Sequence, residues 1–333
     1  MAADTKQKPF RDLLKHHRDI FVDPLLWTYR HLDLVGCRFE DVDTASTASI
    51  QDDCKADNEQ RPCPKLTRDA EQLATHPFPV AKHYHLASIL MGKDRAFAKT
   101  RKGPTFFFTG QPVHRPHYTV FYRGKLDEHI RNSPYPLVGY LHYTDVNGDR
   151  RSKFEPCPAP NGGQNWIGGN ILHKRLAQIK PKEWTHDPYY VCVLLALAQF
   201  QERKIGLLRP VVYTSRLLVT NICDKEFIHF YEAEISAELL EVLRSPKTAT
   251  EYKKWPTIWR RKIPFKPYDT FADRIMAELV TPRPLRFPEP STQSDDLNGA
   301  NLKMEPSIRS DLNGTKRPCE QESNKEYKMK RIT

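Results

Sequence analysis

The stretch that decides the fold is residues 187–243, DPYYVCVLLALAQFQERKIGLLRPVVYTSRLLVTNICDKEFIHFYEAEISAELLEVL. It predicts a buried helix, two strands and a second helix. Asp187 is suited to cap the first helix, and Pro188 suits its first position, where a missing N–H costs nothing. Residues 189–200 are almost all apolar, so this helix should be buried on more than one side. The run is shorter than the roughly 20 apolar residues that a membrane span needs.

Two strands are predicted after this helix, at 211–222 and 227–235, because Val, Leu, Ile, Thr and Tyr dominate both. A turn centred on Asp224 and Lys225 would place Val219 opposite Phe230 and Leu217 opposite Glu232. Alternation gives the second strand two faces. One should carry Phe227, His229, Tyr231, Ala233 and Ile235, and the other Ile228, Phe230, Glu232 and Glu234. Ser236 should cap the helix that follows.

Over the whole chain the sequence predicts four regions. These are an N-terminal helical arm at 1–39, an acidic disordered loop at 40–65, an α+β core domain at 66–281 and a disordered tail at 282–333. The predicted fold class is α+β, with a mixed or antiparallel sheet packed with the buried helix. Further helices are expected at 9–35, 66–98 with a break at 76–79, 170–180 and 269–279. Further strands are expected at 105–109, 117–123 and 135–143, and Asn147-Gly148 predicts a hairpin turn over 145–149.

The charge is strongly basic but unevenly distributed. The 333 residues carry a formal net charge of +11, while residues 40–60 hold seven acidic residues and one basic residue. That segment has a net charge of −6, so the rest of the chain carries 11 + 6 = +17. This excess of positive charge favours an acidic partner, either an acidic protein or a nucleic acid. The alternative is a basic protein whose charges are spread over solvated faces. The sequence does not indicate an oligomeric state.

Compartment signals favour an intracellular protein in the nucleus or cytoplasm. No apolar signal segment opens the chain, and no run is long enough to cross a membrane, so no membrane association is expected. Seven scattered cysteines without a CxxC pair indicate free thiols in a reducing compartment. Lys316-Arg317-Pro318 with the later tail lysines resembles a split nuclear-import signal, and residues 302–305 fit a SUMO acceptor pattern. The alternative for both patterns is solubilising charge.

Glu232 and Glu234 are the only candidates for catalysis. Two positions apart on one strand face, their carboxylates would lie about 7 Å apart and could hold Mg²⁺. The order of elements loosely resembles that around a restriction-endonuclease-like site, which implies a divergent or degenerate metal-dependent nuclease. That family has a lysine two positions after its second acid, and no such lysine follows here. A solvated strand end is the alternative. Outside the nuclease hypothesis no cofactor is expected.

No metal site is expected from the other polar residues. The histidine pairs His83/His85 and His114/His117 have no further ligand at a suitable spacing, so hydrogen-bonding or packing roles are expected. Cys192 lies within the buried helix and should be unreactive.

The best partner-binding segment is 252–266, which combines six cations with aromatic residues and has no acid. Lys and Arg neutralise phosphates, and Trp rings can stack on bases. The alternative is that the tryptophans pack on the core while the cations stay in water. The predicted contact residues are Lys253, Lys254, Trp255, Trp259, Arg260, Arg261, Lys262 and Lys266.

Two runs, LLVTNICDKEFIHFYEAEIS at 217–236 and KWPTIWRRKIPFKPYDTFADRI at 254–275, resemble segments of uncharacterised proteins of filamentous fungi. The resemblance implies a fungal, intracellular origin and brings no activity or site residue. The leading hypothesis is therefore a non-enzymatic intracellular interaction or regulatory protein that uses segment 252–266 as its contact surface.

Overall fold

The computed structural model describes residues 9–17, 22–42, 63–91, 95–123, 137–205 and 211–280. The chain divides into two compact units, 1–289 and 290–333, and all the described residues belong to the first. Most of the predicted acidic loop (43–62), the predicted tail and its nuclear-import and SUMO patterns lie outside the described residues. The described part is an α+β fold, as the sequence predicts.

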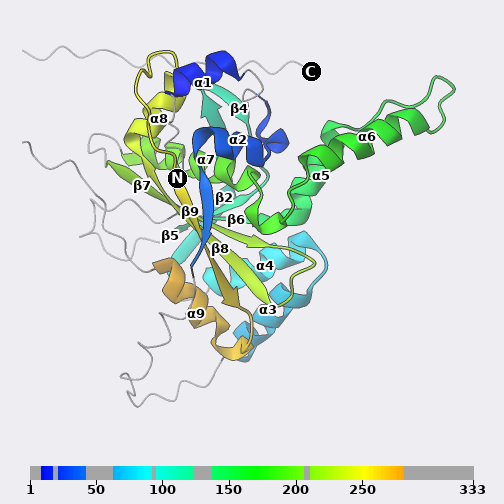
Figure 1. Ribbon diagram of the computed structural model, residues 1–333. Helices are drawn as coiled ribbons and strands as arrows, with labels where there is room; N and C mark the ends of the chain where they lie inside the picture. The colour runs from blue at the N-terminus through cyan, green and yellow to red at the C-terminus, as the bar shows by residue number, and fades with distance from the viewer. Residues whose placement is uncertain are drawn as a thin grey trace, which may run out of the picture. The chain divides into compact units, whose positions relative to one another are not determined.

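A mixed seven-stranded sheet forms the centre of the described unit (Figure 1). β6 pairs in parallel with β7, as β1 does with β9, and the other neighbours are antiparallel. The carboxyl ends of β1, β2 (Phe97–Lys102), β6, β7 and β9 therefore lie along one edge. In spatial order the strands are β1 (Arg38–Asp41), β9 (Thr257–Pro264), β8 (Phe227–Ser236), β7 (Val212–Thr220), β6 (Leu137–His142), β5 (Thr119–Arg123) and β2 (Phe97–Lys102). A separate hairpin joins β3 (Phe106–Phe108) to β4 (Gln111–His114).

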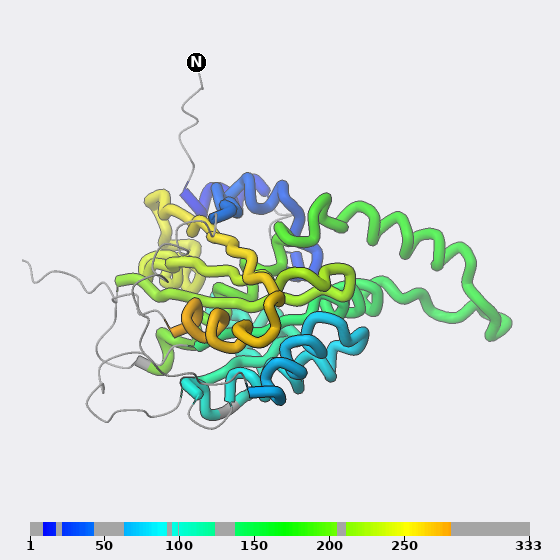
Figure 2. Tube along the Cα trace, turned by 90° about the horizontal axis from the view of Figure 1, so that it is seen from below, coloured from blue at the N-terminus to red at the C-terminus, as the bar shows by residue number. Residues whose placement is uncertain are grey.

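Helices cover both faces of the sheet, because the strands alternate apolar side chains between two cores. Tyr231, Ala233 and Ile235 face the first core, and Ile228 and Phe230 face the second, which confirms the predicted division of β8. Figure 2 shows the helices on either side of the strands. The first core holds α1 (Phe10–His16), α2 (Tyr29–Val35), α7 (Tyr189–Ile205) and α8 (Ala237–Arg244), and the second holds α3 (Pro64–Thr75), α4 (Pro79–Leu90) and α9 (Tyr268–Val280). Short 3₁₀ turns occupy Pro24–Leu26 and Trp184–His186.

The predicted buried helix is α7, and its cap is also the site of a buried ion pair. Each residue from Tyr189 to Ala198 is at most 1% exposed. Asp187 accepts a hydrogen bond from the Tyr189 N–H at 2.9 Å, which confirms the predicted cap. Two nitrogens of Arg150 also donate to this carboxylate, at 2.6 and 2.7 Å. Removing either partner would leave a buried charge, which costs about 3–5 kcal/mol.

The β7–β8 hairpin is confirmed, but its predicted register is wrong by one residue. Val219 lies opposite His229 rather than Phe230, and Leu217 lies opposite Tyr231. The turn is centred on Asp224 alone, because its carboxylate accepts from the N–H groups of Glu226 and Phe227 at 3.0 and 2.9 Å. This side-chain turn replaces the expected symmetrical two-residue one.

The predicted hairpin at 145–149 is wrong, because these residues lie in helix α5 (Tyr143–Lys153). β6 leads directly into this helix, and the His142 side chain caps it. Val146 and Arg150 are buried on its inner side, while Asn147 and Gly148 are exposed in its second turn. Burial of that inner side outweighs the local turn preference of Asn-Gly.

The first residues of the predicted disordered loop are ordered. Glu40 and Asp41 complete β1, which begins within the predicted N-terminal arm and pairs with β9. The loop prediction is wrong here because strand pairing with β9 supplies contacts that local composition does not show. Helix ends were better predicted, since the break between α3 and α4 falls at 76–78 and Ser236 caps α8 through the Leu239 N–H at 3.1 Å.

Candidate nucleic-acid interface

The predicted contact segment 252–266 contains β9, which lies between β8 and β1 inside the sheet. Trp255 is 6% exposed and packs against Phe10, with the ring centroids 5.8 Å apart. Ile258, Ile263 and Phe265 are also buried. The apolar residues of segment 252–266 therefore pack mostly in the core, as the alternative interpretation of this segment expects.

Three of the six cations of this segment are paired with acids. Arg260 is 6% exposed and donates to Asp41 at 2.6 Å. Burial opposes ionisation of Asp41, but the Arg260 guanidinium holds the pKa of that carboxyl below its usual value. Arg261 donates to Glu278 at 2.9 Å, and Lys253 lies 2.9 Å from Glu238.

The other members of the segment are distributed rather than gathered. Trp259 is half-buried, and Lys254, Lys262 and Lys266 are exposed. Lys262 and Lys266 lie over the rings of Phe227 and Tyr268, respectively. The structure therefore does not bring the eight predicted contact residues together on one surface.

The predicted catalytic pair lies in an arginine environment. Glu232 is 2% exposed and accepts from Arg216 Nε at 2.9 Å, while Arg261 Nη2 lies 3.9 Å from its other oxygen. Glu234 is half-buried on the same face. Glu232 is therefore ion-paired with two arginine side chains. Across the described ranges, no three His, Cys, Asp or Glu side chains converge to hold a metal ion.

Three of the four paired histidines make hydrogen bonds, and the fourth, His83, stacks on Tyr140. His85 Nδ1 lies 2.8 Å from an Asp69 oxygen, His114 Nε2 lies 2.8 Å from the Tyr189 hydroxyl, and His117 Nδ1 lies 2.9 Å from Asp149. Cys192 is fully buried, and burial raises the pKa of its thiol well above the usual value. A protonated, inaccessible thiol is a poor nucleophile.

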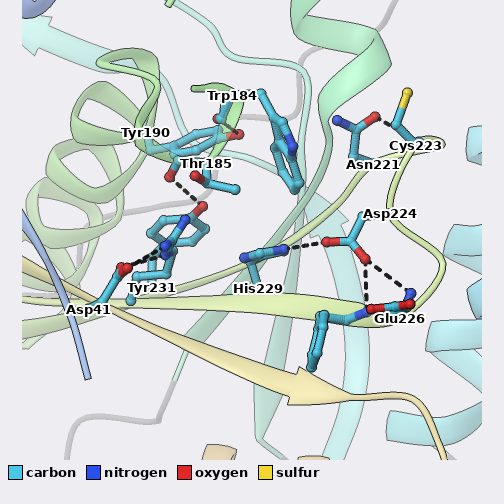
Figure 3. A network of polar contacts seen from close by, with 12 residues as sticks. Asp41, Trp184, Thr185, Tyr190, Asn221, Cys223, Asp224, Glu226, His229 and Tyr231 are labelled. Carbon is cyan, nitrogen blue, oxygen red and sulfur yellow. Dashed lines mark hydrogen bonds and ion pairs between the residues drawn. The ribbon is translucent and has the colours of Figure 1, made fainter. Parts of the chain in front are cut away.

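A buried polar network stabilises the β7–β8 turn (Figure 3). His229 Nε2 is 2.7 Å from Asp224, and the His229 ring meets the Trp184 ring edge-on at 4.8 Å. Burial raises the pKa of Asp224, but hydrogen bonds from His229 and from two backbone N–H groups outweigh this and leave it below its usual value. Nearby, the Tyr231 hydroxyl donates to the Thr185 carbonyl at 2.6 Å. The contacts of Asp224 fix the turn that links β7 to β8.

A second basic and aromatic element lies outside the sheet. We call residues 156–182 the α6 projection; they comprise a connecting segment, helix α6 (Trp166–Ile179) and three following residues. Figures 1 and 2 both show it extending beyond α5, away from the strands. Within α6, which is described throughout, Leu172 is the only buried residue. Asn165 caps the helix by accepting from the Gly168 N–H at 2.7 Å.

The α6 projection carries positive charge without neutralising partners. From Pro156 to Lys182 the sequence has no acidic residue. Its cations are all exposed, and none forms an ion pair with the described part of the chain. Arg175 lies over the Phe154 ring at 5.6 Å, which leaves its charge available. These cations are Lys174, Arg175, Lys180 and Lys182.

The projection also exposes large apolar side chains. Trp166 is 71% exposed, Ile167 78% and Ile171 47%. Asn170, Lys174 and Gln178 are exposed at a spacing of four residues, so they form one ridge of the helix beside the isoleucines. The sequence predicted this basic helix but not an interface. The missed signal was the absence of acids across 156–182 next to an unburied tryptophan.

No protein-family model and no curated protein sequence matches the chain. Among the described helices, none is both long and apolar enough to span a membrane. The resemblance to fungal proteins thus stays a prediction. What the fold and the site define is an α+β protein with a projecting basic helix.

Proposed function

We propose that the protein is a non-enzymatic intracellular binding protein that contacts nucleic acid through the α6 projection. The observation that carries this proposal is a set of four exposed cations in and just after α6, which form no ion pair with the described residues, in a stretch without acids from 156 to 182. Lysine and arginine that neutralise phosphates release counterions, which supplies most of the affinity in non-specific nucleic-acid binding. An acidic side chain in the same stretch would repel the phosphates. The proposal keeps nucleic acid as the predicted partner but places the contact surface on the α6 projection instead of segment 252–266.

The dimensions and chemistry of α6 suit a DNA groove. Its 14 residues give a rod of about 21 Å, and the major groove, about 12 Å wide, admits one helix. Asn170 and Gln178 present amides, which can pair with adenine edges, and the isoleucines can contact thymine methyl groups. Trp166 can stack on an exposed base near a strand end or kink.

The same face fits a lipid surface poorly. An interfacial helix keeps its polar residues on one side and its apolar residues on the other. In α6 the exposed ridge of Asn170, Lys174 and Gln178 adjoins Ile167 and Ile171, so burying the isoleucines in lipid would also bury polar groups. A nucleic acid offers acceptors and apolar atoms in the same groove. A nucleic-acid partner would also suit a nuclear location, which the split basic pattern in the C-terminal tail predicts.

The test is binding of a fluorescently labelled DNA duplex, an RNA duplex and a single strand, measured by anisotropy with the full chain. Lys174→Glu with Arg175→Glu should weaken binding about 10- to 100-fold. The matched control reverses two exposed cations of the other segment, Lys262→Glu with Lys266→Glu. We expect the control to stay within about twofold of wild type, because only long-range charge changes.

The two double variants decide between the two surfaces. If the Lys262/Lys266 variant loses binding and the α6 variant does not, segment 252–266 is the interface and our proposal is wrong. If the wild type binds none of the three probes but binds vesicles of anionic lipid, the partner class is wrong.

The nuclease alternative can be examined with the same probes. Under that hypothesis, Mg²⁺ or Mn²⁺ would cause cleavage that Glu232→Ala abolishes. We expect intact probes, because Glu232 is buried and ion-paired with Arg216 and Arg261. Metal-dependent cleavage that survives repurification and disappears in the variant would restore the alternative.

A further inference from the structure

A pocket of about 440 Å³ lies at the carboxyl ends of β2 and β6, apart from the α6 projection. Its walls come from the first turns of α4, the segment before β5, the end of β6 and the first turn of α5. Its volume falls within the range of about 300–1,000 Å³ typical of sites for small organic ligands. Ligands of open sheets with parallel strands commonly bind beyond the carboxyl ends of those strands.

His142, which lines this pocket, has a buried hydrogen-bond donor without an acceptor. Its side chain is 2% exposed, and Nδ1 accepts from the Thr144 N–H at 3.3 Å. Burial, assisted by the charge of Lys82, lowers the pKa of His142 to about 4, so the ring is neutral near pH 7. A neutral imidazole that accepts at Nδ1 carries its proton at Nε2. No described residue accepts a hydrogen bond from Nε2.

The rest of the pocket supplies charge and a second imidazole. Lys102 ends β2 and Arg115 precedes β5; both line the pocket, are exposed, and form no ion pair within the described ranges. His83 stacks on Tyr140, with centroids 6.1 Å apart, and its buried Nε2 also has no described partner. Asp145 contributes a half-buried carboxyl, and burial, followed by the charge of Asp149, raises its pKa.

We propose that this pocket binds a small organic acid that carries a phosphate or carboxylate together with a hydroxyl or amino group. The anionic oxygens accept from His142 Nε2–H and lie against Lys102 and Arg115. Asp145 receives the hydroxyl or amino group. This arrangement satisfies the buried donor of His142 and places Asp145, the carboxyl among the described lining residues, away from the anionic end of the ligand.

The experiment is a titration of the full chain, labelled with ¹⁵N-histidine, followed by NMR of the imidazole nitrogens. The probes are inorganic phosphate, ribose 5-phosphate and malate, which separate the phosphate from the carboxylate source. With at least one organic probe, we expect a saturable shift of the His142 Nε2 resonance. His31, whose Nδ1 takes part in the capping of α2 and which does not line the pocket, should not move.

A matched pair of variants tests the cation. Lys102→Ala should weaken the saturable binding about tenfold, because it removes a charge-assisted contact. Arg101→Ala removes the neighbouring exposed cation of β2, which does not line the pocket, and should leave the binding unchanged. Both residues are exposed, so loss of folding is not expected from either change.

Three outcomes would overturn the assignment: absence of a saturable shift with every probe, equal weakening by both variants, or saturation by inorganic phosphate alone without any organic probe. Failure of this test would not affect nucleic-acid binding by the α6 projection, because the projection does not line the pocket.

Discussion

Segment 252–266 and the α6 projection have similar amino-acid compositions, but they differ in how the rest of the chain covers and neutralises them. Each combines aromatic residues with several cations and has no acidic residue. In the first, acids from elsewhere in the chain neutralise much of the charge, as Asp41 does for Arg260 and Glu278 for Arg261. In the second, every cation is exposed without an ion pair among the described residues. A basic stretch therefore indicates an interface only when the fold leaves its charge unpaired.

The tryptophans show the same contrast. Trp255 is 6% exposed within the first core, whereas Trp166 is 71% exposed on α6. Burial of a tryptophan stabilises the fold, whereas an exposed one contributes little to folding and is available to a partner. Substitutions in segment 252–266 should therefore change the stability of the fold, and substitutions in the α6 projection should change binding.

The largest difference in stability is expected between the alanine variants of the two tryptophans. Trp255→Ala should lower the free energy of unfolding by about 3–5 kcal/mol, because it opens a cavity beside Phe10. Trp166→Ala should change it by about 0.5 kcal/mol or less. Urea unfolding followed by circular dichroism measures both values. Equal losses would mean that Trp166 is buried in solution.

Charge reversal should give the next effect. Arg260→Glu places a carboxylate in a largely buried position beside Asp41 and should cost about 3 kcal/mol. Arg175→Glu, with the same charge change on α6, should cost about 0.5 kcal/mol or less. The same unfolding measurement applies, and the contrast fails if Arg260→Glu is as stable as Arg175→Glu.

A third effect, which depends on pH, is expected from a buried cation that forms no ion pair with a described carboxylate. Lys82 is 1% exposed and donates to the carbonyls of Leu73 and Ala74 at 2.5 and 2.9 Å. Burial lowers the pKa of Lys82 from 10.5 to about 8, although the charge of Asp224 opposes this.

Between pH 8 and 10.5 the unfolded chain therefore holds a proton at Lys82 that the folded chain has lost. Stability should rise with pH across this window, relative to the Lys82→Met variant. Below pH 8 the difference between the two proteins should be constant. The control is Lys174→Met, which removes an exposed lysine of α6 and leaves Lys82 unchanged. A flat difference for Lys82→Met would show that this amine titrates normally.

The parts of the fold that follow from neighbouring residues could be predicted from the sequence. The cap at Asp187, the apolar run of α7 and the two faces of β8 depend on residues close together in the chain. The register of β7 and β8 was missed, because a side chain of the turn decides it. Helix α5 was missed because burial of Val146 and Arg150 overrides a strong local turn signal.

The candidate sites were harder to predict, because most of them depend on contacts between residues that lie far apart in the sequence. Asp41 and Arg260 are 219 positions apart, so the sequence could not show that one neutralises the other. The pocket is assembled from four segments, and its key donor is known only because Thr144 occupies Nδ1 of His142. The α6 projection was within reach of the sequence, since its lack of acids is a local property.

The central claim is that the unpaired charge of the α6 projection contacts phosphates, and the salt dependence of DNA binding tests it most directly. The slope of log K against log salt, measured between about 50 and 200 mM, counts the phosphates that the protein neutralises. Replacing Lys174 and Arg175 by alanine should reduce the magnitude of this slope by about 2, and replacing Lys262 and Lys266 by alanine should leave it unchanged. Equal slopes for wild type and the Lys174/Arg175 variant would contradict the claim.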